Sequence, residues 1–426
     1  MRKRIAVQHL QPGMYVAELD RPWRETPFLF QGFEIRSPAD IEELKRFCEW
    51  VYVEIPETFA WPPPPAAPRR PAPVPTEAEQ RVARDLLKII NQPRGAPVYA
   101  DRCSLEQEMP AAHAHYLAAR DALHGVMADV RAGRSIDGHG IGRAVGELAE
   151  SIIRNPDALN CLTQLKRKDE YTALHSLRVC ILALAFGRHL GLDRDMLHAL
   201  GIGALLHDVG KLRVPDAILT KPGALDEQEL ALMRRHVPYG VEILERTPSI
   251  PRAAIEVARC HHERYDGSGY QEGLKGDQIG LFGMIGGIVD CYDAVTSDRP
   301  YREGMSSHMA LKRMYEWRGR EFHPALTEQF IQCMGIYPIG SVVELNTGEV
   351  GVVVAMNRVR RLKPRVALVL DGNCRPYAEA RTVDLLQRKG ADGQSCDIDR
   401  VLEPGSYGID PVRYLPIPDL PRAAPA

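Results

Sequence analysis

The amino-acid sequence predicts a mainly α-helical protein with a small α+β module before its helices and a small β module after them. Residues 76–335 place apolar side chains three and four positions apart with few breaks, which is typical of helices. Short apolar runs of the strand type occur instead within residues 1–60 and 338–371. The length of 426 residues allows two to four domains.

The composition argues against several classes of protein. The 54 Lys and Arg residues nearly balance the 56 Asp and Glu residues, so coating nucleic acid or an anionic membrane is not the expected role. The longest uninterrupted apolar runs, such as residues 196–206 and 281–289, are far shorter than the ~20 residues that span a bilayer. Nine cysteines without a C-x-x-C pair favour reduced thiols. We therefore expect a soluble, cytoplasmic protein whose partners include neither a nucleic-acid polymer nor a membrane.

Residues 1–60 are expected to form the α+β module. Apolar and polar positions alternate at residues 14–16 and again at 50–55, and a helical pattern lies between them at 39–47. Eight of the 33 prolines then fall within residues 61–75, a composition that stays extended. We interpret this segment as a linker, and a ligand for an SH3-type domain is the alternative.

The remaining borders follow from changes in pattern. A helical connector is expected at residues 76–135, and its helices are long and amphipathic enough to mediate homodimer contacts. The main helical domain is expected at 136–336, and a β module, a partial barrel, at 337–415. The basic residues between 358 and 365 are expected on a solvated hairpin. Residues 416–426, rich in Pro and Ala, are expected to be disordered.

The residues that carry chemistry lie between Tyr171 and Arg302. Seven of the 14 histidines fall within residues 175–290. The first, His175, borders an apolar stripe on a helix expected to end at Gly191. Taken alone, His175 fits a core histidine as well as a ligand.

A second candidate pair, His207 and Asp208, follows the apolar helix of residues 196–206. Gly210 is the expected stop of that helix, and Lys211 lies just beyond it. A carboxylate buried at this point needs an ion pair or a metal ion.

Two further helices deliver three histidines. Residues 226 and 229, Asp and Glu, predict a capping box for a helix that carries His236, where Val237-Pro238 bends the chain. A helix that starts near Pro251 is expected to end at His261 and His262, whose side chains point about 100° apart.

The last helix, residues 281–296, adds Asp290 and Asp293. Five histidines and two aspartates thus lie at or near successive helix ends, more ligands than one metal ion needs. Two ions that share the carboxylate of Asp208 would use them all. A nitrogen-rich set favours iron, manganese or zinc over magnesium or calcium. The five histidines are His175, His207, His236, His261 and His262, and the two aspartates are Asp208 and one of the pair Asp290 and Asp293.

These motifs resemble the HD-GYP family, bacterial phosphodiesterases of the HD superfamily that hydrolyse cyclic di-GMP. The resemblance rests on His175, HDVGK from His207, His236, HHERYDGSGY from His261, and DCYDAVTSDRPYR from Asp290. The first sixty residues resemble a poorly understood domain often found ahead of HD-GYP domains. The stretch GIYPIGSVVELNTGEVGVVV resembles the extension often found behind them.

The resemblance implies an all-helical HD-type metal-dependent phosphohydrolase domain and a role for each motif residue. The first metal ion would be held by His175, His207, Asp208 and Asp290. The second would be held by Asp208, His236, His261 and His262. Contacts to substrate phosphates would come from Lys211, Arg299 and Arg302, with Lys211 at the scissile phosphate. Asp293 would orient a ligand of the first ion.

The implied reaction is hydrolysis of cyclic di-GMP to pGpG, with further cleavage to GMP as an extension, by a hydroxide that bridges two divalent ions. Iron or manganese is expected, with zinc as an alternative. A homodimer and signalling proteins such as diguanylate cyclases are the implied protein partners. Two alternatives stay open: a cyclic di-GMP receptor or scaffold with little turnover, and another nucleotide phosphohydrolase of the HD superfamily.

Two positions depart from the family pattern. Members that bind a third metal carry a glutamate four residues before the first histidine, where this chain has Tyr171, so two metal ions are expected. The family's Gly-Tyr-Pro turn is Gly269-Tyr270-Gln271 here, which we expect to change the stiffness of an exposed loop and affect partner contacts more than catalysis.

Four residues near the candidate ligands are expected to be structural. His189 and His198 lie in the same interval but match no family motif. Cys260 and Cys291 neighbour candidate ligands, and small buried thiols are the default reading, with redox sensing as the alternative.

Overall fold

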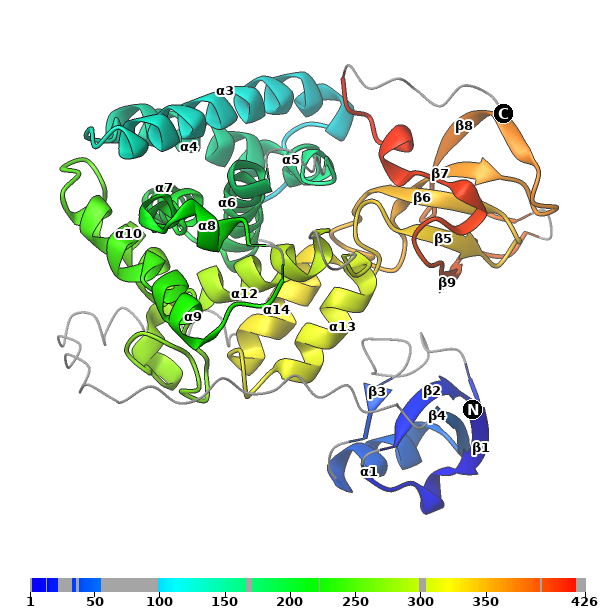
Figure 1. The fold of residues 1–426 in the computed structure, drawn as a ribbon. Helices are drawn as coiled ribbons and strands as arrows, with labels where there is room; N and C mark the ends of the chain where they lie inside the picture. The colour runs from blue at the N-terminus through cyan, green and yellow to red at the C-terminus, as the bar shows by residue number, and fades with distance from the viewer. Residues whose placement is uncertain are drawn as a thin grey trace. The chain divides into compact units, whose positions relative to one another are not determined.

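The structure is a computed structural model that describes residues 2–12, 14–21, 33–35, 38–54, 99–165, 171–221, 223–298, 304–390 and 393–418. The chain divides into two units, one holding the N-terminal strands and the other holding most helices and the C-terminal sheet, and each is described by itself. The predicted mainly helical fold with a small sheet near each end is confirmed (Figure 1). The proline-rich segment and residues 419–426 lie outside the described residues.

The N-terminal unit contains an antiparallel sheet of strand order β1-β4-β2-β3. Its elements are β1 (Arg2–Ala6), β2 (Tyr15–Leu19), β3 (Phe33–Glu34), α1 (Pro38–Phe47) and β4 (Trp50–Glu54). Alternation along β4 buries Val51 and Val53, which form a core with Val16 of β2 and Leu44 of α1. The expected alternation and helix are therefore present, and β1 is a strand that the sequence pattern did not single out.

Twelve helices are described after residue 99. Their bounds are α3 (Leu105–Arg131), α4 (Gly138–Arg154), α5 (Pro156–Leu162), α6 (Tyr171–Leu190), α7 (Arg194–Leu206), α8 (Asp216–Leu219), α9 (Glu227–Arg234), α10 (His236–Glu245), α11 (Arg252–Cys260), α12 (Gly280–Thr296), α13 (Ser307–Trp317) and α14 (Pro324–Met334). The long helix α3 packs along α4 and α5 (Figure 1). The domain borders expected at residues 60, 75, 135, 336 and 415 remain predictions.

Helices α6 and α12 form the centre of the helical domain. The helical segments Ala173–Leu190 and Gly276–Thr296 are long and apolar enough to cross a membrane. The sequence analysis did not find them, because it considered only uninterrupted apolar runs, which are shorter. In the described structure 94% and 72% of the residues of the two segments are buried inside the protein. Burial of this kind is what core helices show, so the apolar length of both helices reflects the core.

Glycines allow the helices that carry the candidate ligands to approach closely. A Cβ atom on Gly203 of α7 would lie 2.4 Å from the carbonyl oxygen of Ala254 in α11. On the other side of α11, a Cβ atom on Gly286 of α12 would lie 2.7 Å from Cγ1 of Val257. Neither distance is possible for a larger residue without movement, so α11 depends on glycine at both contacts.

Two local predictions were wrong in the same way. Helix α7 ends at Leu206, before the expected stop at Gly210, which lies in the 3-10 helix η4 (Val209–Arg213). Glycine is needed there because a Cβ atom would lie 1.9 Å from the carbonyl oxygen of His236. The capping box predicted for α9 is present, but α9 ends at Arg234, and His236 begins the next helix. Pro238 lies in the first turn of that helix, where proline is tolerated.

The C-terminal module is a five-stranded antiparallel sheet of order β8-β7-β6-β5-β9. Its strands are β5 (Val342–Leu345), β6 (Val350–Ala355), β7 (Arg365–Leu370), β8 (Pro376–Asp384) and β9 (Ile398–Val401). The three apolar runs of the sequence form the three central strands. The two edge strands were not singled out, because most residues of β8 and β9 are exposed or half-buried and give no apolar run.

Two basic residues, Arg358 between β6 and β7 and Arg365 at the start of β7, join this sheet to the helices. The expected solvated hairpin is wrong for Arg358, whose partner is buried, whereas the ion pair of Arg365 is exposed. Arg358 pairs with the buried carboxylate of Asp157 in α5, which also accepts the backbone N–H of Met356 at 2.8 Å. Arg365 donates to Glu106 of α3 at 2.7 Å. The buried carboxylate of Asp157 needs donors, which explains the arginine at position 358.

Candidate metal centre

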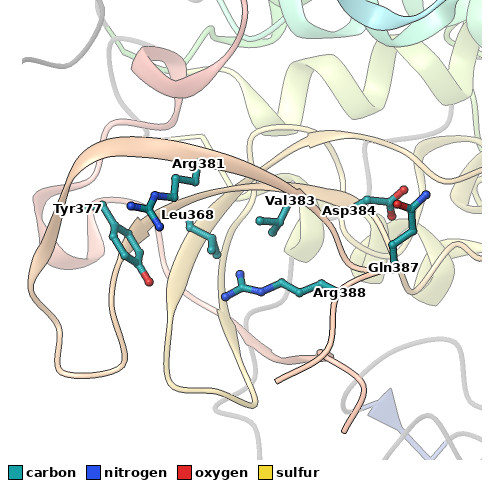
Figure 2. Close-up of a pocket in the computed structure, with 7 residues that line it drawn as sticks. All are labelled: Leu368, Tyr377, Arg381, Val383, Asp384, Gln387 and Arg388. Carbon is teal, nitrogen blue, oxygen red and sulfur yellow. The ribbon is translucent and has the colours of Figure 1, made fainter. Parts of the chain in front are cut away.

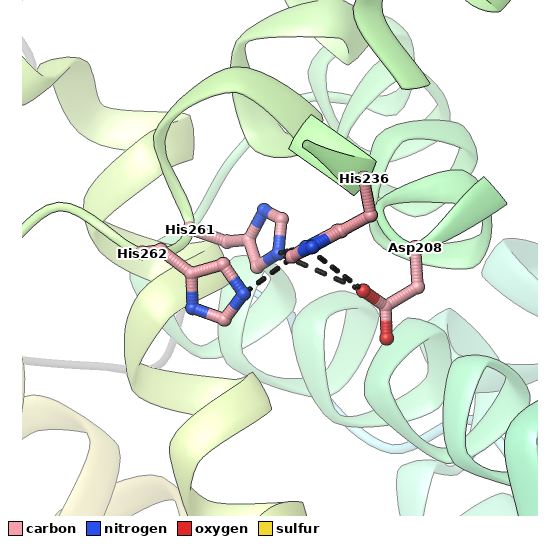
Figure 3. A group of neighbouring side chains, drawn as sticks. All are labelled: Asp208, His236, His261 and His262. Carbon is pink, nitrogen blue, oxygen red and sulfur yellow. Dashed lines mark hydrogen bonds and ion pairs between the residues drawn. The ribbon is translucent and has the colours of Figure 1, made fainter. Parts of the chain in front are cut away.

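The seven candidate ligands lie together, although they come from five separate parts of the helical domain. Figure 3 shows four of them, Asp208, His236, His261 and His262, with their nitrogen and oxygen atoms directed at one point. Five of the seven side chains belong to residues that are at most 4% exposed, namely His175, His207, Asp208, His236 and His261. Polar groups buried to this extent need partners.

The predicted ligands of the second ion form one group whose ligand atoms all lie within 4.8 Å of one another. Oδ1 of Asp208 lies 3.4 Å from Nε2 of His236 and 3.8 Å from Nε2 of His261. Nε2 of His262 lies 3.2 Å from Nε2 of His236. The local chain explains this convergence: His236 stands at the break between α9 and α10, and His261 and His262 stand where α11 ends.

The predicted ligands of the first ion surround the other oxygen of Asp208. Its Oδ2 lies 3.3 Å from Nε2 of His207 and 3.7 Å from Nε2 of His175. Oδ1 of Asp290 lies 3.1 Å from Nε2 of His175 and 3.8 Å from Nε2 of His207. The two oxygens of Asp208 thus face two different histidine groups, an arrangement suited to a shared carboxylate.

Backbone carbonyls determine which ring nitrogen faces the centre. The Nδ1–H of His207 donates to Ala204 O and that of His236 to Met233 O, both at 2.8 Å. The Nδ1–H of His261 donates to the carbonyls of residues 257 and 258 at 3.1 and 3.0 Å. A carbonyl can only accept, so Nδ1 carries a proton and Nε2 of each ring is the nitrogen that faces the centre, where the neutral form of the ring has its lone pair.

These lone pairs test whether the residues fit a metal ion. Nε2 of His207 and Oδ1 of Asp208 are buried without a hydrogen-bond partner. Nε2 atoms of His236 and His261 lie 3.5 Å apart, and neither carries a proton to share. Electron pairs and carboxylate oxygens gathered in this way repel one another, and a cation between them removes the repulsion. The donor set therefore fits divalent metal ions.

The pKa shifts favour the metal-binding forms of the second group and of both carboxylates. Burial disfavours the charged imidazole and lowers the pKa of His261 to about 3, and it also lowers the pKa values of His236 and His262. Burial opposes ionisation of Asp208, yet the ammonium of Lys211 holds the pKa of this carboxyl well below its usual range. Asp290 behaves likewise through His175, which lowers the pKa of that carboxyl.

His175 differs from the other histidines because carboxylates hold it. Its Nδ1–H donates to Oδ2 of Asp293 at 2.7 Å, as expected for a residue that orients a ligand. Burial disfavours the charged ring, but the hydrogen bonds to Asp290 and Asp293 outweigh this effect and raise the pKa of His175 to about 9.

Arg178 is a functional residue that the sequence reasoning missed. Its Nε and Nη2 atoms donate to the two oxygens of Asp293 at 2.6 and 2.9 Å, and Nη2 also donates to Ser297. Arg178 is 3% exposed. A signal existed, because an arginine within the apolar run of α6 requires a buried partner.

The more exposed side of the centre is formed by Lys211 and Asp290, whose side chains are 28% and 14% exposed. Nζ of Lys211 donates to Oδ2 of Asp208 at 2.5 Å. Arg299 and Arg302, the other predicted phosphate contacts, lie outside the described residues, so their roles remain predictions.

The residues expected to be structural have partners away from the centre. His189 contacts Oε1 of Gln329 at 3.0 Å, and His198 contacts the carbonyl of Gly142 at 2.7 Å. Cys260 is buried, and burial raises the pKa of its thiol, which disfavours thiolate chemistry.

A cavity of about 390 Å³ lies in the C-terminal sheet and contains none of the predicted site residues (Figure 2). Its lining residues are Leu368, Tyr377, Arg381, Val383, Asp384, Gln387 and Arg388. Arg388 beside it is paired with Glu349 at 2.8 Å. Among the residues that the structure describes, the groups of side chains that could hold a metal ion are in the helical domain, so the chemistry is assigned there.

Three families match consecutive parts of the chain. A domain of unknown function, DUF3391, matches residues 2–140, the HD domain matches 155–326, and a KOW domain associated with the HD domain matches 342–407. All seven candidate ligands fall within the HD match, and an HD domain implies dependence on divalent metal ions.

Known proteins with similar sequences are phosphodiesterases. A cyclic di-GMP phosphodiesterase of Pseudomonas aeruginosa is 36% identical over 387 residues, which cover 90% of this chain and 89% of the relative. A 3'3'-cGAMP-specific phosphodiesterase of Vibrio cholerae is 37% identical over 174 residues, 41% of this chain and 33% of the relative. A solved HD-GYP-type structure from Bdellovibrio bacteriovorus aligns with a TM-score of 0.45 and 15% identity over 78% of this chain and 98% of that chain. Since the Pseudomonas relative matches along nearly the whole length, the chain belongs to the HD-GYP family of cyclic di-GMP phosphodiesterases.

Proposed function

We propose that this chain hydrolyses cyclic di-GMP to the linear dinucleotide pGpG with two divalent metal ions, iron or manganese, or alternatively zinc. His175, His207, Asp208 and Asp290 would hold one ion, and Asp208, His236, His261 and His262 would hold the other. The observation that supports this assignment is the position of Asp208, whose two oxygens face the Nε2 atoms of two different groups of histidines.

When bound, the two ions supply an activated water and neutralise charge on the phosphate. The chain's own residues position these groups. Asp293 and Arg178 hold the ring of His175, and backbone carbonyls hold the other rings. Lys211 donates to Asp208 at the centre, and its ammonium would stabilise the charge on an oxygen of the scissile phosphate.

The substrate assignment follows from the relatives. The Pseudomonas protein that matches over 90% of this chain is named for cyclic di-GMP. The Vibrio protein named for 3'3'-cGAMP matches only 41% of this chain and is represented in this comparison by one third of its length. We therefore rank cyclic di-GMP first and 3'3'-cGAMP second. Action in the cytoplasm, a homodimer and contact with diguanylate cyclases remain part of the proposal.

Product formation tests the proposal. Full-length protein loaded with Mn²⁺ under low oxygen should convert cyclic di-GMP to pGpG, followed by chromatography, and a parallel reaction with 3'3'-cGAMP ranks the two substrates. A later GMP peak would show that pGpG is cut again. The double variant His207→Ala, Asp208→Ala should abolish conversion, and His139→Ala, a change at an exposed histidine of α4, is the control that should retain it. Full activity of the double variant would refute the assignment.

The same experiment separates an enzyme from a receptor. Metal-free protein that binds cyclic di-GMP, and metal-loaded protein that forms no product, would together favour the receptor. Hydrolysis of other nucleotides in preference to both cyclic dinucleotides would favour a different HD-superfamily phosphohydrolase.

A further inference from the structure

Gln271 stands where the family has proline, and its backbone excludes proline. Its φ is 102°, in the region that favours glycine, whereas the proline ring fixes φ near −65°. The loop of this chain therefore has its own conformation, and something must stabilise it.

The side chain of Gln271 supplies a missing donor to helix α9. Its Nε2 donates to the carbonyl oxygen of Arg234, the last residue of α9, at 2.6 Å. If the helix continued, that carbonyl would accept from the residue four positions later, which is Pro238 and has no N–H. Gln271 thus satisfies a carbonyl that the local chain leaves open.

The neighbouring Tyr270 connects the same loop to a candidate ligand. Its ring stacks on the imidazole of His262, with ring centroids 4.5 Å apart and planes 26° apart. The guanidinium of Arg234 lies 4.8 Å from the centre of the Tyr270 ring, on the helix whose carbonyl Gln271 contacts. Arg234, Tyr270 and His262 therefore contact one another in series.

These contacts join the two segments that deliver His236 and His262. His236 follows Arg234 by two residues, and His262 follows the end of α11, yet their Nε2 atoms lie only 3.2 Å apart. The pair Tyr270-Gln271 contacts both segments at once. We propose that Gln271 is a positioning residue that fixes the separation of His236 and His262 for one metal ion. The inference rests on the proposed second metal site.

Metal affinity and stability of the metal-free protein test this role together in the full-length chain. Gln271→Met keeps the length of the side chain but removes the donor, and Gln271→Lys keeps a donor. Gln271→Gly removes the donor and relieves the positive φ. Gln278→Met is the matched control, since Gln278 accepts a backbone N–H within the following turn without contacting either histidine. Mn²⁺ binding is followed by calorimetry, and unfolding of the metal-free chain by circular dichroism.

Wild-type protein should bind two Mn²⁺ ions. We expect about tenfold weaker binding of one of them in Gln271→Met and Gln271→Gly, the scale seen when groups that orient ligands are removed. Gln271→Lys and the control should bind as the wild type does. The unfolding temperature of metal-free Gln271→Gly should not fall. If Gln271 served only the stability of the loop, this variant would instead unfold at a lower temperature.

Two results would overturn this inference but leave the proposed function standing. One is wild-type affinity for both ions in Gln271→Met or Gln271→Gly, and the other is an equal loss of Mn²⁺ affinity in Gln271→Met and Gln271→Lys. Wild-type protein that binds fewer than two ions would overturn the proposed function and this inference with it.

Discussion

At the residue scale, the centre depends on a local pattern that three histidines share. His207, His236 and His261 each donate from Nδ1 to a carbonyl three residues earlier in the chain. Such carbonyls are available where a helix ends or breaks, because their usual N–H donors are lost there. A histidine placed at a helix end is thereby held in one tautomer, with Nε2 ready for a metal ion.

The Arg178 fork should be needed for the first metal ion. Arg178→Lys keeps the charge but cannot contact both oxygens of Asp293 at once, so His175 loses its fixed orientation. We expect a 10- to 100-fold weaker affinity for one of two Mn²⁺ ions, measured by calorimetry, with the other unchanged. Unchanged affinity for both ions would show that Arg178 has no positioning role.

The two metal sites should respond differently to pH. His175, with a pKa of about 9 in the metal-free protein, carries a proton at pH 7 that an ion at Nε2 must displace. Affinity at that site should rise about tenfold per pH unit between pH 7 and 9 and then level off. His236, His261 and His262 have lowered pKa values and are already neutral, so their site should change little above pH 7.

Calorimetry at pH 7.5 in buffers of different ionisation enthalpy measures this proton directly. One of the two Mn²⁺ ions should release about one proton from His175, and the other close to none. Equal proton release by both ions would contradict the assignment of His175 to one site only.

At the element scale, close helix packing should govern both stability and the site. Gly203→Ala would press a methyl group against the Ala254 carbonyl, a backbone atom that cannot move cheaply, and so separate α7 from α11. His207 and His261 directly follow the last residues of these two helices. We expect the free energy of unfolding of the metal-free protein to fall by about 2 kcal/mol in a urea titration, with weaker Mn²⁺ binding.

Gly125→Ala in α3 is the matched control for that change. A Cβ atom on Gly125 meets nothing within 4 Å, so the helix should gain up to about 1 kcal/mol from the better helix former. If both variants changed stability alike, packing at Gly203 would not be the cause.

Sequence patterns predicted elements well where the cause was local. The capping box of α9 and the start of α11 after Pro251 depend on neighbouring residues, and both were predicted correctly. The end of α7 and the place of His236 were wrong. Gly210 and Pro238 looked like helix breakers, but Gly210 serves the contact with α10, which no local pattern reveals.

At the scale of the whole molecule, the C-terminal sheet should stabilise the helical domain without entering its chemistry. Arg358→Ala would leave the carboxylate of Asp157, 4% exposed, without its ion pair. We expect the free energy of unfolding to fall by about 3 kcal/mol. This is the lower end of the range for breaking a buried ion pair, because the side chain of Arg358 is 25% exposed. Mn²⁺ affinity of the folded protein should stay at the wild-type value. A urea titration and calorimetry check the two statements, and a stability within 0.5 kcal/mol of the wild type would show that this ion pair is not needed.

The candidate site was more predictable than the contacts that support it. All seven residues carry metal-binding chemistry, and five of them lie at helix ends, whereas His175 lies within α6 and Asp290 within α12. Residue types therefore indicated a shared site better than position along the helices did. Contacts between residues far apart in the sequence could not be predicted in this way, because no local pattern marks them. The bridge from Gln271 to Arg234, and the pairing of Arg358 with Asp157, depend on how helices and loops meet in three dimensions. The loop at Gln271 was accordingly assigned to partner contacts, whereas the structure places it against His262 through Tyr270.

The most direct test is anomalous diffraction from crystals of the Mn²⁺-loaded protein. We expect two peaks about 3.5–4 Å apart, with Asp208 between them, one beside His175 and the other beside His262. A single peak at these residues, or peaks only elsewhere in the chain, would contradict this expectation.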